Sequence, residues 1–245
     1  MAKWLAAIAA GVCATPAPGQ PPPILGRGLG SFPLNAAVLN SSRNALDAQT
    51  AAALAALIAK TGPAATPTAP VAPEVTLTYE PDARLSDWTR LSMLDTLSGG
   101  NSSVRGRLQE AFADNAVLKR FDAYMSARGY SSNNVADDMA ELLLVSWQIV
   151  TDTKATDAQA LGVHTQTHSL FLINSTLQTL TAADRQLMAE RFAYQVILSS
   201  SAHEEFLRNG DPAQRRQLQE SSEALLREQG VDARKVHLTD QGFKN

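Results

Sequence analysis

The stretch from Gly129 to Thr151 constrains the fold more than any other part of this chain of 245 residues. It begins with a glycine, and Ser131, Ser132 and Asn133 then offer three candidate helix caps. At about 100° per residue, the large apolar side chains that follow fall within one broad arc. These residues are Val135, Met139, Leu142, Leu143, Trp147, Ile149 and Val150. Such a wide apolar face predicts a central core helix.

Three acidic residues of this predicted helix, Asp137, Asp138 and Glu141, fall on the side opposite the apolar arc. Paired carboxylates can act as acid and base or can hold a cation. In the first turns of a helix, however, negative charge is also stabilised by the helix dipole. Because all three lie on the polar side, we favour solvated carboxylates that complement the dipole.

Helical patterns continue through the rest of the C-terminal two thirds of the chain. Thr156 is a candidate cap for the next helix, and Thr181 with Asp184 resembles a capping box. Asp211 followed by Pro212 combines a cap with a proline at the first helical position. The sequence therefore predicts an all-α fold, a bundle of about six or seven helices joined by short loops.

The first 14 residues have the pattern of an export signal. A short positive start precedes the apolar run from Trp4 to Val12, and small residues follow up to Ala14. This run is shorter than the roughly 20 residues that cross a bilayer, so no transmembrane segment is expected in the mature chain. An Ala-rich first helix is the alternative, and lipidation of Cys13 is disfavoured because Val12 is large. We expect a periplasmic or extracellular protein, which cleavage after Ala14 would leave without cysteine.

Residues 15–74 are rich in proline and alanine and predict an extended N-terminal arm. Within the arm, residues 41–60 form either a helix or a solvated Ala-rich spacer. The helical domain follows over 75–245. Its alternating start, from Val75 to Tyr79, indicates a short strand or an extended docking segment.

Two segments of the domain, 129–150 and 231–243, carry short motifs found together in one family. The matching positions are Gly129, Val135-Ala136-Asp137, Trp147, Leu238-Thr239 and Gly242-Phe243. Over roughly residues 79–243, the chain resembles a bacterial family of exported proteins that is classed only as a domain of unknown function. The resemblance implies a helical body in an exported protein. It brings no activity and no catalytic residues.

His164 and His168 are the sharpest candidates for chemistry, because histidines four residues apart lie on one helix face and can bind a transition metal. Thr165 stands where a zinc protease would carry its general base. A third ligand from His203 or the acids after it is not placed nearby by any pattern. Two histidines at a helix seam or on the surface are therefore favoured over a metal site, and we expect no cofactor.

The sequence signals for other classes of function are weaker. The net charge is −3 and no basic patch stands out, so no nucleic-acid partner is expected. Residues 199–203 put serines beside a histidine but lack the glycines of a nucleophile elbow. An interaction or structural module of the cell envelope or secreted fraction, with a protein partner, is favoured over an enzyme. A metal-binding protein or enzyme that uses the His164/His168 helix is the alternative, and an exported inhibitor or effector is a third option.

Overall fold

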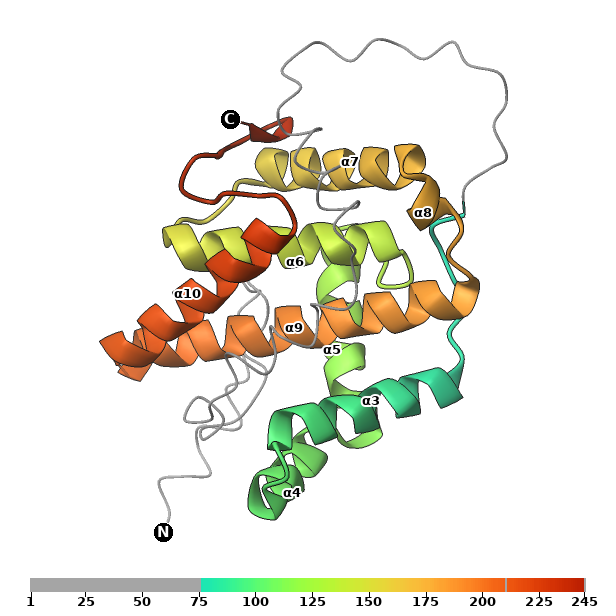
Figure 1. Ribbon diagram of the computed structural model, residues 1–245, viewed down its shortest axis with the longest axis vertical. Helices are drawn as coiled ribbons and strands as arrows, with labels where there is room; N and C mark the ends of the chain where they lie inside the picture. The colour runs from blue at the N-terminus through green and yellow to red at the C-terminus, as the bar shows by residue number, and fades with distance from the viewer. Residues whose placement is uncertain (1–75, 210, 245) are drawn as a thin grey trace, which may run out of the picture.

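The computed structural model describes residues 76–209 and 211–244 (Figure 1). The predicted export signal (1–14), the arm (15–74) and its possible helix (41–60) lie outside the described residues. Within the described ranges the chain is a bundle of helices with one small β-hairpin, so the predicted all-α fold is confirmed. In chain order the elements are α3 (Ala83–Ser98), α4 (Ser102–Ala111), η1 (Ala113–Asn115), α5 (Ala116–Ser126), α6 (Val135–Thr151), α7 (Asp157–Ile173), α8 (Ser175–Gln178), α9 (Ala182–Asn209), α10 (Pro212–Glu228), β1 (His237–Thr239) and β2 (Gly242–Lys244).

The helix starts follow local capping signals. Thr156 and Gln159 form a reciprocal capping box at α7, and Thr181 and Asp184 exchange the same bonds before α9. Asp211 accepts bonds from the first turn of α10. Each of these starts was predicted from the sequence, because a cap depends on residues three apart and on nothing distant.

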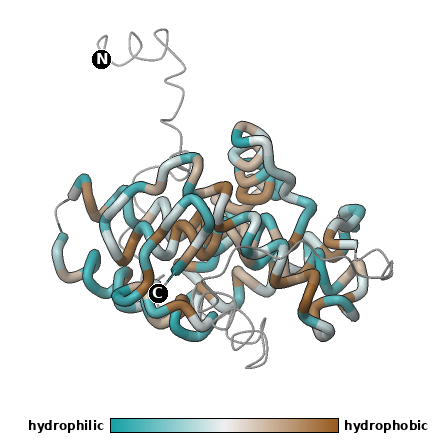
Figure 2. The backbone as a smooth tube through the Cα atoms, turned by 90° about the horizontal axis from the view of Figure 1, so that it is seen from above, coloured by the Kyte–Doolittle hydropathy of each residue, from teal (hydrophilic) through white to brown (hydrophobic). Residues whose placement is uncertain are grey.

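Helix α6 lies at the centre of the bundle and contacts α7, α9 and α10 most extensively (Figure 1). Every residue from Val135 to Trp147 is buried, and Ile149 is buried as well. The predicted core helix is thus confirmed, but it is buried all round rather than along one arc. Figure 2 shows hydrophobic and hydrophilic residues interspersed along the backbone of the described residues. None of the helices in the described ranges combines the length and apolar character that crossing a bilayer requires.

The first described residues run beside the loop that leads into α6. Thr78 forms an isolated antiparallel bridge with Asn134, and the Tyr79 N–H donates to the Asn133 carbonyl at 3.1 Å. The Tyr79 hydroxyl donates to the Ser132 carbonyl at 2.9 Å. This extended segment therefore docks on the loop, which is one of the two roles predicted for it, and helps to fix the start of α6.

The C-terminal hairpin packs on α7. Leu238 pairs with Phe243 in the antiparallel register, and both side chains are buried. The Gln166 side chain bridges α7 to the hairpin, since it accepts from the Phe243 N–H at 2.9 Å and donates to the Phe243 carbonyl at 3.0 Å. Gln159 donates to the Leu238 carbonyl at 3.0 Å. The terminal motif of the sequence is thus a strand–turn–strand unit anchored by two glutamines of α7.

Gly162 allows the hairpin to approach α7 this closely. A Cβ at Gly162 would lie 2.4 Å from the Gly242 nitrogen and 2.7 Å from the Asp240 carbonyl. We expect Gly162→Ala to lower the free energy of unfolding by about 1–3 kcal/mol, because backbone must move apart. Gly106→Ala on α4 is the matched control, since nothing lies within 4 Å of its Cβ, and it should raise stability by up to about 1 kcal/mol. Urea unfolding of both variants measures this difference. An equal loss of unfolding free energy in Gly162→Ala and Gly106→Ala would contradict the close packing at Gly162.

Candidate functional site

The histidine pair of α7 faces the first turns of α6. His164 Nδ1 lies 2.9 Å from Asp137 Oδ1, and His168 Nε2 lies 2.8 Å from the same oxygen. His164 is buried, whereas the His168 side chain is 36% exposed. The two imidazoles share one helix face, as their spacing predicts, and both are directed at a single carboxylate oxygen.

A second carboxylate closes the other side of His164. Glu141 Oε2 lies 3.7 Å from His164 Nε2, which is an ion-pair distance and too long for a hydrogen bond. The Tyr124 hydroxyl donates to Glu141, and the Arg128 guanidinium donates to Tyr124 at 2.8 Å. The Tyr130 ring stacks on the His164 ring with centroids 3.5 Å apart. His164 is therefore held between two acids and under an aromatic ring, a group that we call the His164 cluster.

Burial and pairing compete in the His164 cluster, and pairing prevails. Burial alone would lower the pKa of His164, but its interactions with Asp137 and Glu141 raise the pKa above the ordinary value. Burial would likewise raise the pKa of both acids, yet the histidines lower that of Asp137. The pKa of Glu141 is lowered in the same way, by its interactions with His164, Arg128 and Tyr124. The structure thus favours an imidazolium between two carboxylates.

The interpretation of Asp137, Asp138 and Glu141 as solvated residues is wrong. Their exposed fractions are 7%, 1% and 0%, respectively. A helical wheel separates apolar from polar positions but does not show what covers the polar side. Here α7 covers Asp137 and Glu141 with histidines, and Asp138 faces a cleft beside α9. The polar side of α6 is therefore an interior surface with polar partners.

Among the described residues, no third ligand completes a metal site at the histidine pair. His203 lies at the opposite end of α6, where its Nε2 is 3.9 Å from Asp152 Oδ1. Across residues 76–209 and 211–244, no three or more His, Cys, Asp or Glu side chains are grouped so that they could hold a metal ion. The expectation that His164 and His168 bind no metal stays a prediction, and both imidazoles are committed to Asp137.

The pKa directions in the His164 cluster predict a pH dependence of stability. A raised pKa of His164 adds stability that is complete below the unfolded value of about 6.5 and is lost as the pH rises through the folded value. The lowered pKa values of Asp137 and Glu141 add stability that is present above about pH 4.5 and is lost as the pH falls. The cluster should therefore stabilise most between about pH 4.5 and 6.5. Urea midpoints measured across pH should decline on the alkaline side, and His164→Gln should flatten that decline; an unchanged slope would contradict the pairing.

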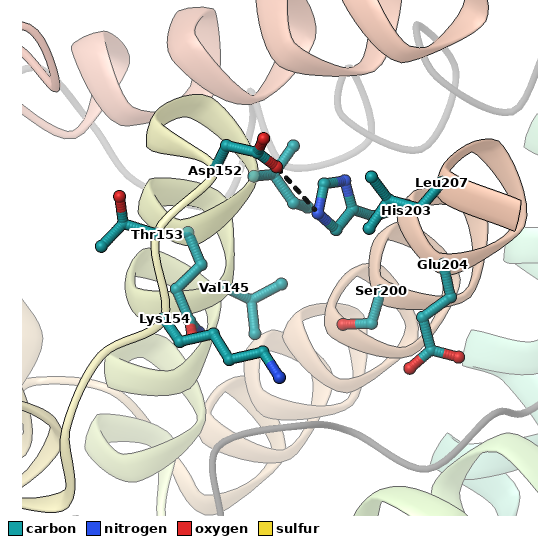
Figure 3. A pocket seen from close by; sticks show the side chains of 10 residues that line it. Val145, Asp152, Thr153, Lys154, Ser200, His203, Glu204 and Leu207 are labelled. Atoms are coloured by element: carbon teal, nitrogen blue, oxygen red, sulfur yellow. Dashed lines mark ion pairs between the residues drawn. The ribbon is translucent and has the colours of Figure 1, made fainter. Parts of the chain in front are cut away.

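A half-open pocket of about 230 Å³ lies at the C-terminal end of α6, against α9 (Figure 3). We call it the α6–α9 pocket. Val145, Ile149 and Leu207 provide apolar walls. Lys154 and Glu204 bring opposite charges to the lining, and the Leu207 side chain is half exposed. The pocket thus offers apolar surface framed by polar groups.

The polar groups of the α6–α9 pocket do not form a hydrolase triad. Asp152 forms an ion pair with Arg215. Its Oδ1 lies 3.9 Å from His203 Nε2 (Figure 3). Burial lowers the pKa of His203. The nearby Asp152 charge opposes this effect and the Arg215 charge reinforces it, so the neutral imidazole is favoured. The buried Ser200 hydroxyl has no hydrogen-bond partner among the described residues, so it is not bonded to His203 as a nucleophile to its base. The set supports binding better than acyl transfer.

The sequence pattern of one family, described as "Family of unknown function (DUF6683)", matches residues 6–245. The chain belongs to this family. The resemblance seen in the segments 129–150 and 231–243 is thereby confirmed, and the match extends well beyond residues 79–243. Neither the curated proteins nor the solved structures that were compared with the chain gave a match. Membership of this family therefore assigns no activity to the chain.

Sequence reasoning missed the partners of the histidines. Tyr124 and Arg128 lie four residues apart, Tyr124 at the end of α5 and Arg128 just beyond it, and Tyr130 follows in the loop. Their spacing places an aromatic hydroxyl and a cation on one face. This was the available signal for a buried acid nearby, but it does not specify Glu141. Only the packing of three helices brings these residues together.

Proposed function

We propose that the protein is an exported binding module of the cell envelope or secreted fraction, which holds a protein partner at the α6–α9 pocket. The main support for this proposal is the pocket itself, whose apolar walls are Val145, Ile149 and the half-exposed Leu207. Its volume of about 230 Å³ lies below the roughly 300–1,000 Å³ typical of small-molecule sites. It suits one or two inserted side chains of a partner, the usual form of an interface anchor.

The lining indicates the chemistry of that partner. The apolar walls favour an aliphatic or aromatic anchor. Lys154 and Glu204 offer a cation and an acid beside it, and burial raises the pKa of Glu204 while Arg208 and Lys154 oppose that effect. Polar groups of both signs next to an apolar centre match the polar rim of a protein interface. We therefore favour an apolar residue flanked by polar or mixed-charge neighbours.

The contacts of His164 and His168 do not favour the metal-binding or enzymatic alternative. Both imidazoles are hydrogen-bonded to Asp137, and His164 is also enclosed by Glu141 and Tyr130. A functional site needs ligand or substrate access to an open position. The His164 cluster is better suited to hold α6 and α7 together.

Photo-cross-linking tests the binding proposal. A photoreactive residue at position 207, inside the α6–α9 pocket, should give a defined adduct with one partner in the native host. The matched control is position 161 on α7, because Leu161 is 58% exposed but lies outside the pocket. A second variant, Val145→Asp, should abolish the adduct at 207 if its folding is intact by circular dichroism. Equal adducts at 207 and 161, or none at 207, would refute the pocket as the docking site.

Export is proposed on the pattern of the first 14 residues and is tested separately. The intact mass of the protein recovered from the native host should correspond to a chain that begins near Thr15. Fractionation should place this product in the periplasm or medium. A cytoplasmic product that retains Met1 would overturn the localisation without affecting the pocket.

A further inference from the structure

A second cavity lies at the other end of α6 from the α6–α9 pocket. It has a volume of about 370 Å³ and is lined by the segment before α3, by the loop before α6, and by residues of α3, η1, α5, α6 and α9. Asp138 of α6, Glu190 of α9 and Asp122 of α5 line it. We call it the acidic cleft. Lys119 is the cation in its lining, and its side chain is exposed.

The acidic cleft contains buried oxygen atoms that have no hydrogen-bond partner within the described part of the chain. Asp138 is 1% exposed, and its Oδ1 has no hydrogen-bond partner among the described residues. Glu190 is 5% exposed, and its Oε2 is likewise unpaired there. The Oδ1 of Asn115 is a third such atom. Leaving a buried polar atom unpaired costs free energy, so three at one cavity are evidence of a missing donor.

The hydroxyl donors around the acidic cleft are already in use. The Ser86 hydroxyl donates to Glu190 Oε1, and Gln186 donates to the same oxygen at 2.9 Å. The Ser132 hydroxyl donates to Asp122 at 2.6 Å, and the Tyr79 hydroxyl donates to a backbone carbonyl. The buried oxygens of the cleft that have no partner among the described residues are two carboxyl oxygens and one amide oxygen. Such a set is complementary to a ligand that carries several N–H donors and positive charge.

We propose that the acidic cleft binds an organic cation, an ammonium or guanidinium group, between Asp138 and Glu190. A guanidinium is planar and carries five donors, so one group can serve several carboxylate oxygens at once. A metal ion fits less well, because the described residues form no cluster of three or more acids and histidines that could hold one. The volume lies near the lower end of the range for small-molecule sites, which suits a short organic cation.

The cleft should exchange a proton for its ligand. Burial raises the pKa of Asp138, and four surrounding carboxylates add to that effect: Asp137, Glu141, Glu190 and Asp122. The empty cleft therefore favours the protonated acid. A bound cation stabilises the carboxylate and lowers its pKa, so binding should release protons and should tighten as the pH rises. Lys119 opposes the ligand's charge from the exposed edge of the cleft.

Isothermal titration of the full chain with agmatine, which carries a guanidinium and an ammonium group, tests the proposal. We expect saturable one-to-one binding, with proton release seen by comparing buffers of different ionisation enthalpy. Asp138→Asn and Glu190→Gln should each weaken binding about tenfold or more, because each removes a charged acceptor. Glu110→Gln removes one exposed carboxylate outside the cleft and should leave the affinity unchanged.

Changes in backbone amide NMR shifts locate the bound ligand in the unaltered chain, so this measurement does not depend on how well a variant folds. In the unaltered chain, agmatine should shift the amides of Ser86, Ser132 and Asp138 and leave Leu207 in the α6–α9 pocket unmoved. A short arginine-containing peptide in a parallel titration shows whether the guanidinium comes from a free cation or from a side chain. Absence of saturable binding by either probe, equal weakening in Glu110→Gln, or stoichiometric Ca²⁺ binding in its place would overturn the proposal. The proposed partner at the α6–α9 pocket would be unaffected.

Discussion

Replacement of His164 by alanine is expected to lower the free energy of unfolding by about 3–5 kcal/mol near pH 6, the usual cost of breaking a buried ion pair. The variant leaves Asp137 and Glu141 inside the bundle without their shared imidazolium. It also removes the ring on which Tyr130 stacks. The effect is large because Glu141 is 0% exposed and cannot be compensated by water. Urea unfolding followed by circular dichroism measures it.

His168→Ala is the matched control, because it removes the same kind of side chain from the same helix face. The His168 side chain is 36% exposed, so water can replace it at Asp137, and His164 remains in place. We expect a loss of about 1 kcal/mol or less, in the range of exposed ion pairs. Equal losses in the two variants would show that burial of the His164 cluster does not determine its contribution.

Replacement of Trp147 by alanine is expected to cost about 3–5 kcal/mol, through lost transfer energy and the cavity left behind. Trp147 is 8% exposed and belongs to the main core. It lies on the helix that contacts α7, α9 and α10, so the loss should affect the whole bundle rather than one edge. A shifted urea midpoint with a single cooperative transition is the expected result.

Trp88→Ala is the comparison, because it removes a tryptophan that is much more exposed than Trp147. Trp88 on α3 is 50% exposed, and its ring lies 5.6 Å from the Arg191 guanidinium. We expect a loss of about 0.5–1 kcal/mol, the size of an exposed cation–π contact. A larger loss from Trp88→Ala than from Trp147→Ala would reverse the assignment of inner and outer tryptophans.

Local signals predicted the helices well. The capping residues Thr156, Thr181 and Asp211 each start a helix as expected, because a cap is satisfied within one turn. The apolar arc of α6 also identified the central helix, since Val135 and Trp147 are both buried. These features depend on short-range spacing, which a sequence shows directly.

Tertiary contacts account for what the sequence did not show. Trp88 and Leu91 are large apolar residues, yet both are about half exposed, because α3 lies at the edge of the bundle. The strands at 237–239 and 242–244 are three residues each, too short for an alternation pattern; they pair with each other and are anchored by glutamines of α7. Neither outcome is encoded within one turn of chain.

The sites were predicted only in part. The common helix face of His164 and His168 followed from their spacing, but their bonds to Asp137 depend on how α6 packs against α7. Burial of Asp138 depends in the same way on α9 and the segment before α3. A carboxylate on the polar side of an isolated helix gives no sign of a second helix that covers it.

The lowered pKa values of Asp137 and Glu141 and the raised pKa of His164 imply that α6 holds these two carboxylates ionised inside the bundle, paired with a protonated His164. An NMR titration of the His164 imidazole in the intact protein tests it most directly. We expect His164 to titrate above the ordinary histidine pKa of about 6.5, and Asp137→Asn should move the pKa of His164 downward. An imidazole that is neutral at pH 6, with a pKa unaltered by Asp137→Asn, would contradict this pairing.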